Sequence, residues 1–171
     1  MEANRKEAKG ARPRVVINTS VLFSGAISTK GYAFEVLELL AEGHIVNYVS
    51  EWVLREYQGK LTSKKALKYL SPEEAEGYIN LIRSHSKIVP IKHSFQNSKL
   101  ILEKVSEFED IPFLDVVYNA KAEFLIIYDR KHLLKIRGKN KRFKLNDHEF
   151  YILTPQEFIA LQCIDSEFTP R

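Results

Sequence analysis

Four oxygen-bearing side chains stand where a parallel sheet would bring them together. Asn18 ends the apolar run "RVVIN", and Glu56 lies in the helical segment after the second apolar run. Asp110 opens a predicted helix, and Asp129 ends the run "FLIIYD". Because the carboxyl ends of parallel strands meet at one edge of a sheet, we expect these four residues to converge. Clustered carboxylates repel each other unless a cation joins them, and oxygen-only ligands suit Mg²⁺ or Mn²⁺ rather than zinc.

Each acid also has a simpler structural interpretation. Asp110 would serve as an N-cap, Glu56 as a solvated helix residue and Asp129 as the cap of the short segment that follows it. Asp115 lies five residues after Asp110, about 140° further around a helix, so we expect it to point away from the other acids.

The elements that must position these residues follow from hydrophobic periodicity and helix caps. Predicted strands cover residues 14–18, 44–50, 87–91, 124–129 and 150–154. Predicted helices cover 31–43, 50–61, 62–70, 71–85, 98–109, 110–123, 130–136 and 154–162. This alternation predicts an α/β fold, a three-layer α/β/α sandwich with a mainly parallel central sheet of four to five strands.

The same pattern predicts one folded domain, because no composition shift or internal repeat divides the chain. The domain is expected over residues 14–162, after a flexible basic tail at 1–13 and before a C-terminal tail at 163–171. Starts of the type Ser-Pro-x-Glu at Ser71 and Thr-Pro-x-Glu at Thr154 predict capping boxes for two of the helices.

Composition excludes several classes of protein. With 44% apolar and 28% charged residues, the chain reads as an ordinary soluble globular protein with no membrane span. Its single cysteine cannot form an internal disulfide, which favours a cytoplasmic setting. The sequence contains no G-x-G-x-x-G, no P-loop and no zinc-ligand spacing, and this counts against a doubly wound enzyme acting on a small molecule.

Positive charge is concentrated in one stretch, residues 130–144, which holds eight Lys and Arg and no acid. The rest of the chain has 18 basic and 22 acidic residues, a net charge of −4. This basic strip is either a solvated loop or a surface that contacts the phosphates of a nucleic acid. Its cations are Arg130, Lys131, Lys135, Arg137, Lys139, Lys141, Arg142 and Lys144.

Four segments, in order, resemble the PIN domain, a family of metal-dependent ribonucleases that includes toxins of toxin–antitoxin pairs. The segments are "VVINTSVLFSG", "VSEWVLREYQGKL", "DIPFLDVVYNAKAEFLIIYDRKHLL" and "YILTPQEFIALQ". The resemblance implies that Glu56, Asp110 and Asp129 bind Mg²⁺ or Mn²⁺, and that Thr19 and Ser20 support them. It also implies RNA, single-stranded by expectation, as substrate, with an antitoxin protein and a second copy of the chain as partners.

The sequence departs from the family pattern at Asn18, where the family has its first Asp. Loss of this charge predicts a weakened metal site. Three interpretations remain: a ribonuclease that works with a weakened site, a PIN-like module that has lost catalysis and binds RNA or a protein, or an engineered Asp-to-Asn change. Ser20 also departs from the pattern, which favours a native variant.

Overall fold

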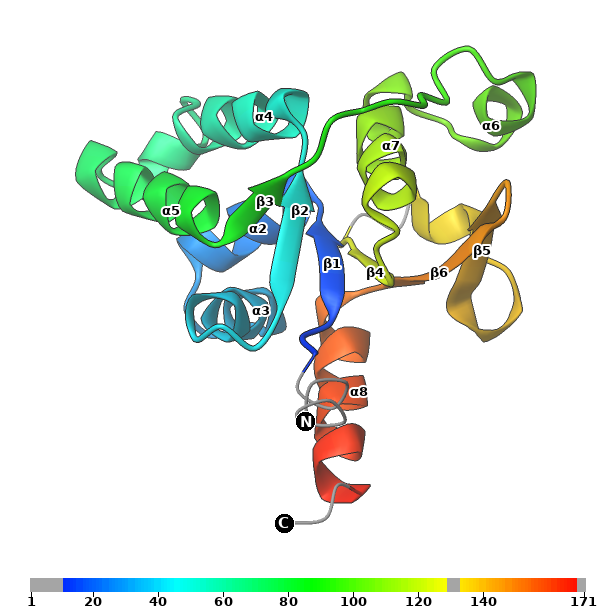
Figure 1. Ribbon diagram of the computed structural model, residues 1–171. Helices are drawn as coiled ribbons and strands as arrows, with labels where there is room; N and C mark the ends of the chain where they lie inside the picture. The colour runs from blue at the N-terminus through cyan, green and yellow to red at the C-terminus, as the bar shows by residue number, and fades with distance from the viewer. Residues whose placement is uncertain (1–10, 129–132, 169–171) are drawn as a thin grey trace.

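The computed structural model describes residues 11–128 and 133–168, and in them the chain forms one six-stranded sheet (Figure 1). The order of the strands across the sheet is β3-β2-β1-β4-β6-β5. Their bounds are β1 Arg14–Ile17, β2 Val46–Val49, β3 Ser86–Ile88, β4 Phe124–Ile126, β5 Arg142–Leu145 and β6 His148–Leu153. The first strand is therefore central, and its neighbours β2 and β4 are both parallel to it.

The mainly parallel sheet agrees with the prediction, but it has one strand more than expected. Strand β5 pairs antiparallel with β6 and begins at the end of the basic strip. Buried and exposed side chains alternate along β5, because Phe143 and Leu145 are buried while Arg142 and Lys144 are exposed. A four-residue edge strand with two cationic residues has too little apolar character to be separated from a loop by sequence pattern.

Helices cover both faces of the sheet. Helix α7 contacts β1 and β2, whereas α8 contacts β6 and α3, and Figure 1 shows α7 and α8 on opposite sides of β4 and β6. The α-helices are α2 Thr19–Ile27, α3 Tyr32–Ala41, α4 Glu51–Leu61, α5 Pro72–Ser84, α6 Lys99–Lys104, α7 Ile111–Ala120 and α8 Pro155–Phe168. Short 3₁₀ turns are η1 Ala66–Lys68, η2 Phe108–Asp110, η3 Leu133–Ile136 and η4 Lys139–Lys141.

Several helical predictions differ from the structure. The helix predicted over 62–70 forms only the short turn η1. Helix α2 was not predicted, and it starts directly after β1, where Asn18 caps it. The helix predicted over 98–109 stops after Lys104 and resumes only as the turn η2. Helix α8 continues to Phe168, into the segment expected as a C-terminal tail.

Both predicted capping boxes are present. The Ser71 hydroxyl accepts from the Glu74 N–H at 3.0 Å, and the Glu74 carboxylate accepts from the Ser71 N–H at 2.9 Å. Thr154 and Glu157 exchange the same pair of bonds at 3.2 and 2.9 Å. These contacts satisfy backbone donors that the first turn of a helix otherwise leaves without partners.

A buried polar network fixes α4 against the centre of the sheet. The Asn47 side chain accepts from the Ile17 N–H at 2.9 Å and donates to the Tyr57 hydroxyl at 3.3 Å. The Tyr57 hydroxyl in turn donates to the Ile17 carbonyl at 2.6 Å. Both side chains are almost fully buried, so the network sets where the residues after β1 lie relative to Glu56, the neighbour of Tyr57.

None of the helices within the described ranges is both long and apolar enough to cross a membrane.

Candidate functional site

A cavity of about 590 Å³ opens at the carboxyl end of β1. Asn18, Glu56 and Asp110 all line it, although they come from the end of β1, from α4 and from the start of α7. Thr19 and Ser20, expected to support these residues, line the same cavity. The structure thus brings together five of the residues singled out from the sequence. Asp129 lies outside the described residues.

Asn18 has a structural function in addition to any chemical one. Its side-chain oxygen accepts from the Ser20 N–H at 3.0 Å, which makes it the N-cap of α2, and the side chain is only 7% exposed. Aspartate caps helices about as well as asparagine, and a negative charge at a helix N-terminus is favourable. The fold therefore accepts either residue at this position.

The hydroxyls of Thr19 and Ser20 differ in their contacts. Ser20 Oγ accepts from the Tyr128 N–H at 3.1 Å, which ties the start of α2 to the chain just after β4 and one residue before Asp129. Thr19 Oγ1 is buried and has no hydrogen-bond partner in the described part of the chain. Ser20 therefore holds the backbone at the cavity, while Thr19 supplies a buried oxygen beside it.

The two acids at the cavity differ in burial. Asp110 is 7% exposed and occupies the position before α7, but across residues 11–128 and 133–168 its side chain accepts no capping bond from that helix. Glu56 is half-buried. Burial raises the pKa of the Glu56 carboxyl above its ordinary value; Lys60 opposes this rise and the nearby Glu109 reinforces it. The Asp110 side chain therefore forms no capping bond to α7 in the described residues, and the Glu56 side chain is only partly exposed to solvent.

The donor chemistry of the cavity fits a hard divalent cation, because carboxylate, amide and hydroxyl oxygens line it. Within the described ranges, however, no three acidic, histidine or cysteine side chains are close enough to form a complete metal-binding group. Asp110 and Glu56 are the carboxylates that would hold the ion, with the amide oxygen of Asn18 and the buried hydroxyl of Thr19 beside them.

Asp115 lies elsewhere, in agreement with its helical phase. Its carboxylate accepts from Phe95 N–H and from Ser94 Oγ, both at 2.8 Å. Burial raises the pKa of this carboxyl, and the two hydrogen bonds oppose the rise. Asp115 thus anchors the loop before α6 and is absent from the lining of the cavity.

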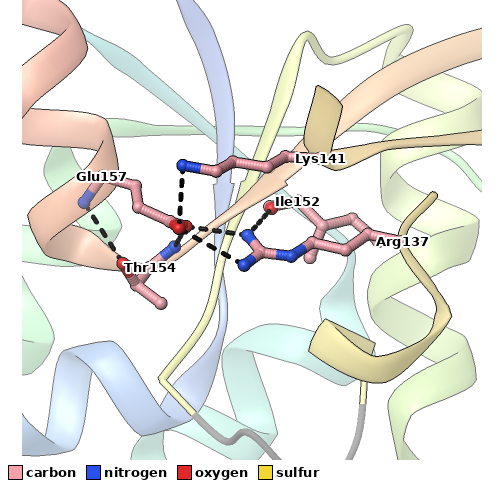
Figure 2. A network of polar contacts seen from close by, with 5 residues as sticks. All are labelled: Arg137, Lys141, Ile152, Thr154 and Glu157. Carbon is pink, nitrogen blue, oxygen red and sulfur yellow. Dashed lines mark hydrogen bonds and ion pairs between the residues drawn. The ribbon is translucent and has the colours of Figure 1, made fainter. Parts of the chain in front are cut away.

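Three cations of the basic strip form ion pairs within the described part of the chain, and Figure 2 shows two of them, Arg137 and Lys141. The Arg137 guanidinium binds Glu157 at 2.7 Å and donates to the Ile152 carbonyl at 2.8 Å, and Lys141 pairs with the same carboxylate at 3.0 Å. Arg142 pairs with Glu149 at 3.5 Å. Lys135, Lys139 and Lys144 are exposed, and Arg130 and Lys131 lie outside the described residues.

Sequence reasoning missed the cations that the structure places at the cavity. Lys60 and Lys65 line it, as do Phe23 and Glu109, whereas no described cation of the basic strip does. Lys60 follows Glu56 by four residues on α4, so the two share one face of the helix. The spacing of Glu56 and Lys60 was the one sequence feature that could have predicted this placement of Lys60, but a Glu–Lys pair at this distance is common on any exposed helix.

The comparisons with known proteins agree with this fold. The family model described as PIN domain matches residues 14–131. The curated protein MJ1680 of Methanocaldococcus jannaschii, described as uncharacterized, is 33% identical over 152 residues, which cover 85% of this chain and 89% of that protein.

Two solved structures are similar in fold. PAE2754 from Pyrobaculum aerophilum has a TM-score of 0.59 and 12% identity, with 90% of each chain covered. VapBC2 from Rickettsia felis, whose crystal structure includes a DNA fragment from their promoter, has a TM-score of 0.50 and 19% identity. That match covers 69% of this chain and 89% of the other.

Proposed function

The chain belongs to the PIN domain family, and from that premise we propose that it is a divalent-metal-dependent ribonuclease with a weakened acidic site. The observation that carries the proposal is the convergence of Asn18, Glu56 and Asp110 on one cavity at the carboxyl end of β1. Glu56 and Asp110 lie 38 and 92 positions after Asn18 in the chain, and the fold brings all three to the same cavity. A shared cation site would explain why these three residues converge.

In this mechanism, Glu56 and Asp110 would hold the cation, with Asp129 as the third acid. The cation, when bound, lowers the pKa of a water and offsets charge on the scissile phosphate. Asn18 contributes a neutral oxygen while it caps α2, and Ser20 holds the backbone that leads to Asp129. Asn18 and Asp110 are both buried, which strengthens electrostatic interactions on their side of the cavity.

The missing charge at position 18 is the reason for a weakened site. One charge 4 Å from another is worth about 4 kcal/mol at an effective dielectric of about 20. A carboxylate in place of the amide would therefore raise cation affinity. Because either residue caps α2, the substitution tests the site without disturbing the fold.

The experiment measures Mn²⁺-dependent cleavage of a labelled single-stranded RNA by the wild-type chain, Asn18→Asp and Asp110→Asn. We expect slow cleavage by the wild type, a gain of roughly tenfold or more in Asn18→Asp, and loss of cleavage in Asp110→Asn. Asp147→Asn is the control, because Asp147 is an acid with 83% side-chain exposure that does not line the cavity.

Two results would change the proposal. If Asn18→Asp equalled the wild type while Asp110→Asn abolished cleavage, the role given to position 18 would be wrong. If no variant cleaved RNA or bound Mn²⁺ by calorimetry, the chain would be a PIN-like module that binds RNA or a protein without catalysis. The absence of an acid at position 18 is the observation that favours this second candidate.

We extend the proposal to partners by analogy with the family. An antitoxin protein and a second copy of the chain are the expected partners, and the similarity in fold to VapBC2 is consistent with a protein partner. Co-purification from the native host, followed by mass spectrometry and sedimentation analysis, tests both.

A further inference from the structure

The cavity that holds the acids also has a cationic and aromatic side. Lys60 comes from the end of α4, and Lys65 comes from the short connection between α4 and η1. Phe23 comes from α2 and lies under Lys65, whose Nζ is 5.3 Å from the centre of the ring. One hollow thus combines carboxylates from α4 and η2 with two ammonium groups and the Phe23 ring.

These two lysines remain available to an anion. Within residues 11–128 and 133–168, neither forms an ion pair closer than 4.0 Å, in contrast to Arg137 and Lys141. Lys60 is near enough to Glu56 to oppose the rise in the pKa of that carboxyl. A cation that is exposed to solvent and not neutralised costs little to bring into contact with phosphate.

The burial of Asn18 and Asp110 limits which ligands can reach them. Asn18 and Asp110 are each only 7% exposed, so a phosphate must enter the cavity to approach them. A flexible single strand can place one phosphate on the floor of the cavity and the next on its rim. An unpaired base of a single strand can stack on the Phe23 ring, whereas a base of a duplex would first have to unpair, which has an energetic cost.

We propose that Lys60, Lys65 and Phe23 form a substrate subsite that binds the phosphate next to the scissile one and stacks its unpaired base. Lys60 and Lys65 hold the phosphate, and the Phe23 face carries the base once Lys65 turns toward the phosphate. Cationic grooves with aromatic platforms are the general means of binding single strands. This inference rests on the proposed ribonuclease function, but it is tested by the binding of nucleic acid and not by cleavage.

The chemistry recognised, phosphate plus an unpaired base, is shared by single-stranded RNA and single-stranded DNA. The probes are therefore a fluorescein-labelled 12-nucleotide RNA, its DNA counterpart and an RNA hairpin stem of the same length. Binding is followed by fluorescence anisotropy in EDTA, so that no metal is present and no cleavage occurs.

The first test compares Lys60→Ala/Lys65→Ala with Lys64→Ala/Lys68→Ala. Both double variants remove two positive charges from the same part of the chain, but Lys64 and Lys68 are exposed and do not line the cavity. We expect the cavity variant to weaken single-strand binding by roughly tenfold and to reduce the salt slope by about 1.4, with little change in the control.

The second test uses Phe23→Leu, which removes the aromatic ring but keeps an apolar side chain at this position. We expect roughly fivefold weaker binding of the single strand and an unchanged salt slope, because stacking involves no counterion release. The unfolding temperature of Phe23→Leu shows whether the variant is folded. If it is not, the double-lysine comparison alone decides.

Equal losses in the two double variants, or no loss in either, would overturn the subsite. Tighter binding of the hairpin stem than of the single strand would also overturn it. Loss of binding confined to RNA would identify RNA as the ligand, and equal loss for DNA would support the shared chemistry. Binding that depends on the cavity lysines without any Mn²⁺-dependent cleavage would keep this inference and reject the proposed ribonuclease.

Discussion

Two groups of cations in this protein have opposite relations to their surroundings. The basic strip is the obvious feature of the sequence, yet Arg137 and Lys141 are both ion-paired with Glu157 and hold the chain before β5 to the start of α8. Lys60 and Lys65 are unremarkable in the sequence, yet they line the cavity that holds the acids. Charge density along the chain therefore does not by itself show which cations are already paired with acids.

The difference has a physical origin. Glu157 is 23% exposed, and its carboxylate receives bonds from a guanidinium, an ammonium and the Thr154 N–H. Phosphate would have to compete with a carboxylate already held in place for those cations. At the cavity, the proposal assigns the acids to a divalent cation. The two lysines can then bind a phosphate of the substrate.

Glu157→Ala should have the largest effect on this comparison. The change removes half of a capping box and two partly solvated ion pairs, so we expect the free energy of unfolding to fall by about 2 kcal/mol. The melting temperature should fall by about 4–8 °C. Glu149→Ala is the control, because its pair with Arg142 is about half exposed and should contribute less than about 0.5 kcal/mol. Equal effects would mean that the strip is not anchored through Glu157.

Acid should weaken the same anchor. Burial alone raises the pKa of Glu157, but hydrogen bonds from Arg137, Thr154 and Lys141 outweigh it and lower the pKa to about 2. A carboxyl whose folded pKa lies below its unfolded value stabilises the fold above that unfolded value, 4.5, and loses this contribution as pH falls toward 2. Chemical denaturation at pH 6, 4 and 2.5 should show the wild type approaching Glu157→Gln. A constant gap between the two would contradict the lowered pKa.

The smallest effect is expected from Lys139→Ala/Lys144→Ala. These lysines are exposed and do not line the cavity, so they should act on RNA only through long-range attraction. We expect single-strand affinity at 150 mM salt to fall by about threefold or less, with no change in melting temperature. A loss larger than that of the Lys60/Lys65 variant would reverse the comparison and make the strip the principal binding surface.

Local signals in the sequence were enough for most of the framework. The alternation of apolar runs with amphipathic segments predicted the mainly parallel sheet, because strand and helix periodicities depend on residues close in the chain. Ser71 and Thr154 predicted their capping boxes for the same reason. Helix α2 was missed because its start depends on whether Asn18 turns its side chain back to the Ser20 N–H.

Only the tertiary structure decided which charges are available. Whether Arg137 meets an acid depends on Glu157, which lies 20 residues further along the chain on another element. Whether Lys65 faces the cavity depends on how α4 packs, and the buried Asn47 and Tyr57 set that packing. Electrostatic interactions depend on distance in space and not on separation along the chain. Residue types alone therefore cannot show which charges are paired.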